Sequence, residues 1–419
     1  MNCGLKNLGG DIIEQAVEDL VPLQTSMNNL NLPSQFGAIP RYMLSYPWPS
    51  PIHLLPKLTQ SAYPRGQDSP GLALWVKRED QAGPLACYGN KYRKFEYIIP
   101  DILAQKQKYG KAVTMLVTEG GTQSNHTVQV ASMARMLDLK CTVLLHKGIG
   151  GLRKAEDKEA FVKVGNVQLN RLLGANVLLT DERDTGDEKG PLIPILDDLK
   201  AQGEIPYWIS SGASLHFLGG LGYARCAFEI EAQEEQLAQG RQLAGTNRFD
   251  YLFVACGSGS TLAGLIAGFK LMEKVKPSVN KPPRKIIGVL VSRKSRPSQE
   301  ERILRLSRMA GQLIGLDAEV DITPDDINLD DRFVGHAYGI LDEDTAKTVE
   351  LAASTDSLVF DPVYTAKVMR GMMHWARDYA ASDRSPQHGL DGRPVNALFM
   401  HTGGQSVLGA YADVWPSNT

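Results

Sequence analysis

The chain has 419 residues, of which 43% are hydrophobic and 22% charged, a composition ordinary for a globular protein of more than one domain. Its formal net charge of −2 creates no field that would recruit nucleic acid or an anionic membrane. The sequence has no run of roughly 18 apolar residues, so it predicts no transmembrane helix.

Five cysteines are scattered along the chain, without a CxxC pair or the spacing of a metal site. A sparse, odd set of this kind is typical of reduced thiols in a cytoplasmic protein, most of them small buried apolar residues. The N-terminus lacks the basic-then-apolar order of a signal peptide. We therefore expect a cytoplasmic protein without a bound metal.

Residues 1–45 have weak periodicity, and we interpret them as an N-terminal extension with one helix near Ile12–Leu20. Prolines then mark an extended segment over residues 47–56, and a strand is predicted at Leu72–Lys77. Helices and strands alternate from about residue 95. They are predicted at Tyr97–Gln107, Ala112–Thr118, His126–Leu137, Lys140–Leu145, Asn166–Leu173, Asn176–Leu179, Ile193–Gln202 and Pro206–Ser210.

A second series follows the first. It comprises a helix at Leu221–Gln236, a strand at Tyr251–Ala255, a helix at Leu262–Val275, a strand at Lys285–Val291 and a helix at Glu300–Gly315. Such alternation predicts an α/β protein whose parallel sheets carry helices on both faces. We expect two doubly wound parallel-sheet domains with a cleft between them. Residues 46–105 and 215–419 would form a large domain, and residues 106–214 a small one.

The first candidate motif follows the predicted strand at 251–255. The residues Cys256, Gly257, Ser258, Gly259, Ser260 and Thr261 then open a helix. A loop of this type exposes N–H groups and hydroxyls at a helix N-terminus, where the helix dipole favours an anion. It is neither a Walker loop nor a dinucleotide fingerprint, since no GK[ST] follows and Leu262 stands where the third glycine belongs. The alternative is a tight turn that needs small residues for packing.

A second strand–loop–helix segment spans residues 118–127 and places Ser124, Asn125 and His126 at the predicted helix start. Ser124 and Asn125 are good N-caps. This segment either binds a substrate carboxylate or a ring hydroxyl, or only caps the helix.

The third candidate is Lys91, which follows a turn and begins a helix together with Arg93 and Lys94. Repulsion between three neighbouring cations and the helix dipole would both lower the lysine pKa. A lysine that forms a Schiff base needs this larger share of neutral amine. Charge alone instead favours a solvated basic helix end.

Tyr338 and Tyr364 precede or lie within further glycine- and proline-marked segments, as does His401. Tyrosines in a cleft can stack on an aromatic cofactor and move protons, although isolated tyrosines are more often core residues. The sequence contains neither HExxH nor a G-x-S-x-G elbow.

Together these segments resemble a known family. Their order is Lys-Arg-Glu-Asp at 77–80, Gly-Asn-Lys-x-Arg-Lys at 89–94, Gln-Ser-Asn-His at 123–126, Gly-Ser-Thr at 259–261, Asp-Pro-Val-Tyr at 361–364 and His-Thr-Gly-Gly at 401–404. This order is similar to that of the tryptophan synthase β-like, fold type II pyridoxal phosphate enzymes. The resemblance is to the branch that holds 1-aminocyclopropane-1-carboxylate deaminase and D-cysteine desulfhydrase, and it runs from about Pro49 to Tyr411.

The resemblance implies pyridoxal 5'-phosphate in the interdomain cleft and a small amino acid as substrate. Lys91 would form the Schiff base and act as base at Cα, with Ser124, Tyr338 and Tyr364 as further catalytic residues. The cofactor contacts would also include Asn90, Lys94, Asn125, Cys256, Gly257, Ser258, Gly259, Ser260, Thr261, Tyr364 and Thr365. Substrate contacts would be Ser124, Asn125, His126, Tyr338 and Gln405. Family members are commonly homodimers, so a homodimer is expected.

The departures from the family bear on the substrate. Cyclopropane deaminases resemble one another in having glutamate at the position of Thr365 and leucine at that of Gln405, and desulfhydrases have a small hydroxyl residue at the first position. A hydroxyl cannot keep the pyridine nitrogen protonated as a carboxylate can, which weakens the electron sink. His126 also leans toward the desulfhydrases, whereas Gln405 and Tyr88 fit neither pattern.

We therefore expect a D-cysteine desulfhydrase-like α,β-elimination that gives a 2-oxo acid and ammonia. The alternatives are ring opening of 1-aminocyclopropane-1-carboxylate and a biosynthetic β- or γ-replacement. A non-catalytic cofactor-binding protein is a further alternative from another class.

Overall fold

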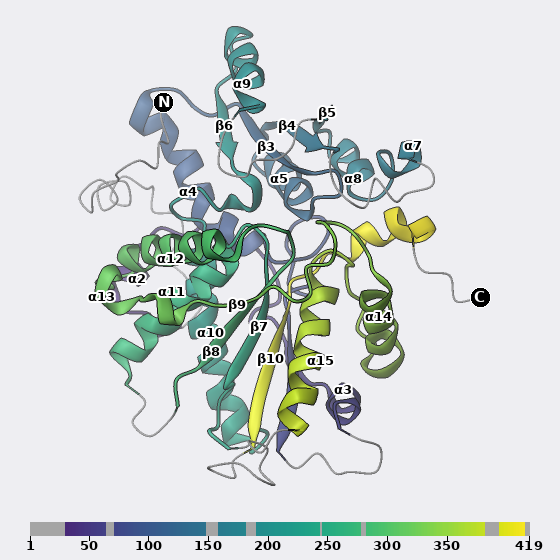
Figure 1. The fold of residues 1–419 in the computed structure, drawn as a ribbon. Helices are drawn as coiled ribbons and strands as arrows, with labels where there is room; N and C mark the ends of the chain where they lie inside the picture. The colour runs from purple at the N-terminus through teal and green to yellow at the C-terminus, as the bar shows by residue number, and fades with distance from the viewer. Residues whose placement is uncertain are drawn as a thin grey trace.

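The protein is described by a computed structural model that covers residues 30–63, 71–147, 158–181, 190–243, 245–277, 282–381 and 394–414. The predicted helix at Ile12–Leu20 lies outside the described residues. Within them the chain forms two sheets, each carrying helices on both faces (Figure 1). No helix among the described residues is long and apolar enough to cross a membrane.

The larger sheet has six strands in the order β1-β2-β10-β7-β8-β9. The strands are β1 (Ile52–Leu54), β2 (Leu72–Arg78), β7 (Tyr251–Cys256), β8 (Lys285–Leu290), β9 (Asn328–Asp330) and β10 (Val395–His401). All neighbours pair in parallel except β1, which runs antiparallel to β2 at the sheet edge. This edge strand lies in the segment that its prolines predict to be extended.

Alternate side chains of the larger sheet enter different cores, as the pleat of a strand requires. Leu398 and Met400 of β10 pack toward one helical layer, and Ala397 and Phe399 pack toward the other. The first layer holds α10 (Leu221–Gln239), α11 (Ser260–Val275) and α12 (Arg296–Leu313). The second holds α3 (Pro56–Ser61), α14 (Glu343–Asp356) and α15 (Thr365–Ala381) (Figure 1).

The smaller sheet has four parallel strands in the order β5-β4-β3-β6. They are β3 (Met115–Gly121), β4 (Lys140–His146), β5 (Asn176–Thr180) and β6 (Pro206–Ile209). Helices α5 (Asn125–Met136) and α8 (Asn166–Leu172) cover one face, and α9 (Leu192–Ala201) covers the other. The remaining elements are α2 (Ser34–Ala38), α4 (Tyr92–Tyr109), α7 (Lys158–Phe161), α13 (Ala318–Asp321), η1 (Ser211–Ala213), η2 (Pro324–Asp326) and η3 (Gln405–Val414).

The predicted α/β fold of two doubly wound parallel sheets is confirmed, and each strand and helix predicted within the described residues is present. The main boundary error concerns α4, which begins at Tyr92 rather than at Tyr97. Its first turn buries Arg93, Lys94 and Glu96 through polar contacts, so hydrophobic periodicity could not reveal it. The domain boundaries at residues 105 and 214 stay a prediction.

Candidate active site

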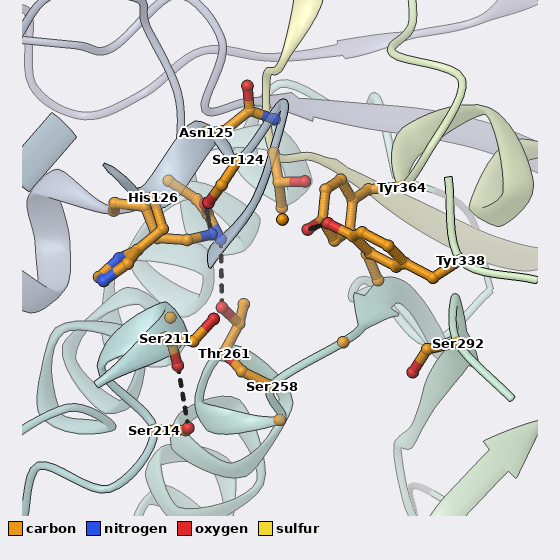
Figure 2. Close-up of a pocket in the computed structure, with 18 of the residues that line it drawn as sticks. Ser124, Asn125, His126, Ser211, Ser214, Ser258, Thr261, Ser292, Tyr338 and Tyr364 are labelled. Atoms are coloured by element: carbon orange, nitrogen blue, oxygen red, sulfur yellow. Dashed lines mark hydrogen bonds between the residues drawn. The ribbon is translucent and has the colours of Figure 1, made fainter. Parts of the chain in front are cut away.

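A cavity of about 440 Å³ lies where the carboxyl ends of strands from both sheets meet. Gly121 and His146 line it at the ends of β3 and β4, and Gly257, Ser292 and Thr402 follow the ends of β7, β8 and β10. Parallel α/β sheets place their ligand sites at this edge because the loops after the strands are free to vary there. Figure 2 shows the labelled side chains around this space.

The loop from β7 into α11 forms one end of the cavity. Gly257, Ser258, Gly259 and Thr261 line it, and the N-terminus of α11 lies at this end. Gly259 has φ +98°, and a Cβ there would lie 2.4 Å from Cδ1 of Ile303, so both conformation and space require glycine. The loop therefore presents backbone N–H groups and hydroxyls to an anion, as the sequence indicates.

Lys91 precedes the first turn of α4 and is partly buried in the cavity wall. Its Nζ donates to Oδ1 of Asn90 at 2.7 Å, and Nδ2 of Asn90 donates to Oγ1 of Thr261 at 3.1 Å. The N–H of Asn90 also donates to the carbonyl of Thr402 at 3.2 Å. Hydrogen bonds thus connect the lysine segment with the α11 loop and the loop after β10.

Burial lowers the pKa of Lys91 to about 8, and the nearby carboxylate of Asp361 opposes that shift. The direction agrees with the sequence prediction, but repulsion between neighbouring cations is the wrong cause. Arg93 turns away from Lys91 and donates to Glu79 at 2.8 Å and to Glu229 at 2.9 Å. Lys94 is buried beneath the α11 loop, where burial and the proximity of Lys91 hold its pKa well below the ordinary value.

The start of α5 forms another part of the wall. Ser124 and Asn125 lie across the cavity from Tyr338 and Tyr364 (Figure 2). Oδ1 of Asn125 accepts from Nδ2 of Asn166 at 2.7 Å, which fixes the amide. The first N–H groups of a helix lack partners within the helix, so this end can accept a carboxylate.

The imidazole of His126 points away from the space between Asn125 and Tyr364 (Figure 2). Its Nε2 lies 3.1 Å from Oγ1 of Thr118, and its ring packs near Phe95. Burial holds its pKa well below the ordinary value, and Lys91 and Lys94 add to that shift. His126 nevertheless belongs to the cavity lining, and its contact with a substrate carboxylate stays a prediction.

Tyr338 and Tyr364 face one another, with their hydroxyl groups hydrogen-bonded and their rings at 72°. A Cβ at Gly257 would lie 3.3 Å from the ring of Tyr364, so this ring stands beside the α11 loop. The carboxylate of Asp361 accepts from the N–H of Val363 at 3.0 Å and of Tyr364 at 2.8 Å, which holds the turn that presents Tyr364.

Four candidate residues lie outside the cavity wall: Cys256, Ser260, Thr365 and Gln405. Cys256 is buried at the end of β7, and burial raises its pKa to about 12. Thr365 is buried and donates to Oδ1 of Asp361 at 2.7 Å. Gln405 donates to Oδ2 of Asp80 at 3.2 Å. Ser260 accepts from Nζ of Lys94 at 2.7 Å and so supports the α11 loop from behind.

Several wall residues were not assigned a role from the sequence, although Gly121, Thr402 and Gly403 lie in the segments quoted at 118–127 and 401–404. They are Gly121, His146, Ser211, Gly212, Ser214, Ala255, Ser292, Arg293, Lys294, Arg302, His336, Ala337, Thr402 and Gly403. Many of them lie at or just after the carboxyl end of a strand. Reading the residues after every predicted parallel strand would have found the segments at 211–214 and 292–294.

The site fits pyridoxal phosphate. A lysine with a depressed pKa, the N-terminus of α11 and two tyrosines line the same cavity. A site that holds pyridoxal phosphate needs these groups, since the lysine can form the Schiff base and the helix N-terminus can bind the phosphate. In agreement, residues 45–385 match the family model described as pyridoxal-phosphate dependent enzyme, and the chain belongs to this family.

Two curated relatives are named 1-aminocyclopropane-1-carboxylate deaminase. The protein from Burkholderia multivorans is 35% identical over 378 residues, which cover 90% of this chain and 97% of its own length. The protein from Methylobacterium nodulans is 34% identical over 372 residues, which cover 88% and 96%. A crystal structure described as an ACC deaminase homologue has a TM-score of 0.68 and 27% identity, covering 90% of this chain and 95% of its own.

An aspartate racemase structure that depends on pyridoxal 5'-phosphate, with 14% identity and a TM-score of 0.52, shares the fold. These likenesses identify the chain as a tryptophan synthase β-like, fold type II enzyme that uses pyridoxal phosphate and belongs among the deaminating lyases.

Proposed function

We propose that the enzyme catalyses α,β-elimination on a small amino acid with a good β leaving group, as a D-cysteine desulfhydrase does. D-cysteine and one water would give pyruvate, hydrogen sulfide and ammonia. The observation that carries this proposal is Thr365, a hydroxyl residue directly after Tyr364 where cyclopropane deaminases resemble one another in having glutamate.

The residues of the wall have separate tasks in this proposal. The α11 loop holds the cofactor phosphate, and the start of α5 with Ser124 and Asn125 holds the substrate carboxylate. Pyridoxal phosphate, when bound, supplies the electron sink that stabilises negative charge at Cα. Neutral Lys91 removes the proton from Cα, and the hydroxyl of Tyr338 donates a proton to the departing β substituent.

The weaker sink follows from what surrounds Thr365. Its hydroxyl donates to Asp361, whose carboxylate also accepts from backbone N–H groups of the turn. No aspartate or glutamate lines the cavity among the residues that the structure describes. A thiolate is a good leaving group and departs even when the cofactor is a weak electron sink. An unactivated cyclopropane ring needs a stronger sink to open, so this environment favours elimination.

The names of the curated relatives favour a second candidate, ring opening of 1-aminocyclopropane-1-carboxylate. It uses the same cofactor and the same Lys91, and it differs in the bond that breaks. A β- or γ-replacement is a third candidate, which added thiols or amines would reveal as new amino acid products.

The deciding experiment compares substrates on the holoenzyme. Sulfide, 2-oxo acid and ammonia are measured with D-cysteine, L-cysteine, β-chloro-D-alanine and 1-aminocyclopropane-1-carboxylate. We expect turnover of the D-amino acids and little of the cyclopropane. Ring opening of the cyclopropane without sulfide release from D-cysteine would make ring opening, not elimination, the favoured function. If no amino acid changes the absorbance spectrum of the bound cofactor, the result would support a non-catalytic protein.

The variant Thr365→Glu tests the reason for that preference. A carboxylate there should strengthen the electron sink. It should lower the ratio of kcat/KM for D-cysteine to kcat/KM for the cyclopropane by about tenfold or more, which corresponds to about 1.4 kcal/mol. Thr365→Ser, which keeps the hydroxyl, should leave the ratio unchanged. A homodimer and a cytoplasmic location stay predictions.

A further inference from the structure

The turn Ser211–Ser214 lies against the α11 loop at one end of the cavity, although it follows β6 of the smaller sheet. Figure 2 shows Ser211, Ser214, Ser258 and Thr261 gathered there. Gly212 has φ +64°, and a Cβ on it would lie 2.2 Å from Oγ of Ser258. Glycine therefore lets the turn approach the loop closely, so that the two form adjoining walls of one niche.

Arg302 of α12 connects these two walls. Its Nε donates to the carbonyl of Ser258 at 3.1 Å, and its Nη2 donates to Oγ of Ser214 at 3.1 Å. Oγ of Ser214 in turn donates to the carbonyl of Ser211 at 3.1 Å (Figure 2). Arg302 is buried, yet it also lines the cavity, so its guanidinium is both fixed and next to the space that a ligand would fill.

Lys94 supports the turn at a second point. Its Nζ donates to the carbonyl of Gly212 at 3.0 Å and to Oγ of Ser260 at 2.7 Å. Oγ of Ser260 donates to the same carbonyl at 3.0 Å. Lys94 of α4 and Arg302 of α12 thus hold the turn of one sheet to the loop of the other.

The charge of a phosphate monoester explains why such a niche would need a permanent cation besides the helix N-terminus. The group carries about −1.5 to −2 near neutral pH, whereas a helix N-terminus offers only about half a positive charge. Burial disfavours the protonated form of Lys94. Arginine keeps its charge at any pH the protein meets. Arg293 and Lys294 also line the cavity but are exposed, so solvent screens them.

We propose that the turn Ser211–Ser214 is the second half of the cofactor's phosphate site and that Arg302 is its positioning residue, supplying permanent charge and fixing Ser214. The sequence motif at 257–261 is then only one wall of the site. The role assigned to Arg302 concerns the cofactor phosphate alone and is independent of which amino acid the enzyme converts.

The experiment compares binding of pyridoxal phosphate and of pyridoxal, which forms the same Schiff base without a phosphate. Cofactor-free protein is titrated with each compound, and absorbance gives both dissociation constants. Arg302→Gln should weaken pyridoxal phosphate binding by about 10- to 100-fold, as expected for lost charged hydrogen bonds, and leave pyridoxal binding unchanged. Ser214→Ala should have a smaller effect of the same selectivity, and Arg302→Lys should restore part of the loss.

Arg305→Gln is the matched control, because Arg305 is an exposed arginine of the same helix and does not line the cavity. It should change neither constant. Equal weakening of both compounds by Arg302→Gln would assign Arg302 to general loop structure and overturn the proposal, as would no change in either. If Arg302→Gln does not fold, Ser214→Ala decides by the same comparison. Substrate turnover plays no part in this test, so it stands or falls apart from the proposed elimination.

Discussion

Lys91 shows how burial, rather than sequence neighbours, prepares a lysine for Schiff-base chemistry. Sequence placed Lys91 beside Arg93 and Lys94 and so predicted a depressed pKa from repulsion. The structure turns Arg93 into a buried network and gives burial as the main cause. Proximity along the chain could reveal the direction of the shift, but it could not reveal where each long side chain points.

A direct consequence is that the amine of Lys91 should become reactive at a lower pH than the amine of an ordinary lysine. In cofactor-free protein, labelling of Lys91 by an amine reagent should rise with pH around a midpoint near 8, because only the neutral amine reacts. Peptide mass spectrometry over a pH series measures the extent at each lysine. Lys347 is the internal control, since its bond with Glu343 raises its pKa and its labelling should need higher pH. Equal midpoints at both lysines would show that burial does not set the reactivity of Lys91.

At the scale of elements, α4 is held in place by a buried ionic network at its first turn. Arg93 lies between Glu79 of the segment after β2 and Glu229 of α10, and Lys77 donates to Glu229 at 2.7 Å. Ser50 donates to Glu79 at 2.6 Å. The two cations balance the two carboxylates, so the network is neutral as a whole while it fixes the helix that carries Lys91.

Removing one member should therefore be costly. Arg93→Met leaves two buried carboxylates with a single cation, and we expect a loss of about 3–5 kcal/mol in the free energy of unfolding. Urea denaturation at neutral pH measures this. Glu343→Gln breaks an exposed pair with Lys347 and should lower the free energy of unfolding far less, because solvent screens exposed ion pairs. A similar small loss for both variants would mean that the network contributes nothing beyond a surface pair.

This network also marks the limit of prediction at the element scale. Every strand that was predicted from a run of apolar residues is present in the described part of the chain, because a buried parallel strand is apolar throughout. The pattern of apolar residues placed the start of α4 too late, since Arg93, Lys94 and Glu96 look like surface residues until their distant partners are known. Glu79 and Glu229 lie far apart in sequence, and no local pattern links them to Arg93.

At the scale of the whole molecule, the order of motifs identified the fold and the cofactor, whereas strand order came only from the structure. Strand β10 pairs with both β2 and β7, so Val395 lies beside Leu72. The pairing of β10 with β2 brings the loop after β10 to the segment of Lys91, where Gly403 forms a bridge with Gly89. The turn Ser211–Ser214 comes to the site in the same way, from the end of a strand of the other sheet, and no sequence motif marks it.

The last residue of β10, His401, is buried by the same pairing of strands, and it should make the stability of the whole chain sensitive to acid. The imidazole is fully buried, with Nε2 3.1 Å from the carbonyl of Val359, and Nδ1 accepts from the N–H of Gly403 at 3.3 Å. A second proton would have to occupy Nδ1 and break the bond to Gly403. Burial accordingly lowers the pKa of His401 to about 4, against attraction from Asp80.

Between pH 6.5 and 4 the unfolded chain therefore binds a proton at this residue that the folded chain does not. Stability contributed by neutral His401 should be complete above about pH 6.5 and fall by about 3 kcal/mol as pH drops to 4, with little further change below. The net charge of −2 leaves global repulsion small near neutral pH, so buried groups dominate the slope. Urea midpoints at several pH values measure it. His401→Gln should flatten the dependence although His126, whose pKa is also lowered, retains part of it; an unchanged slope in this variant would assign the acid sensitivity to other groups.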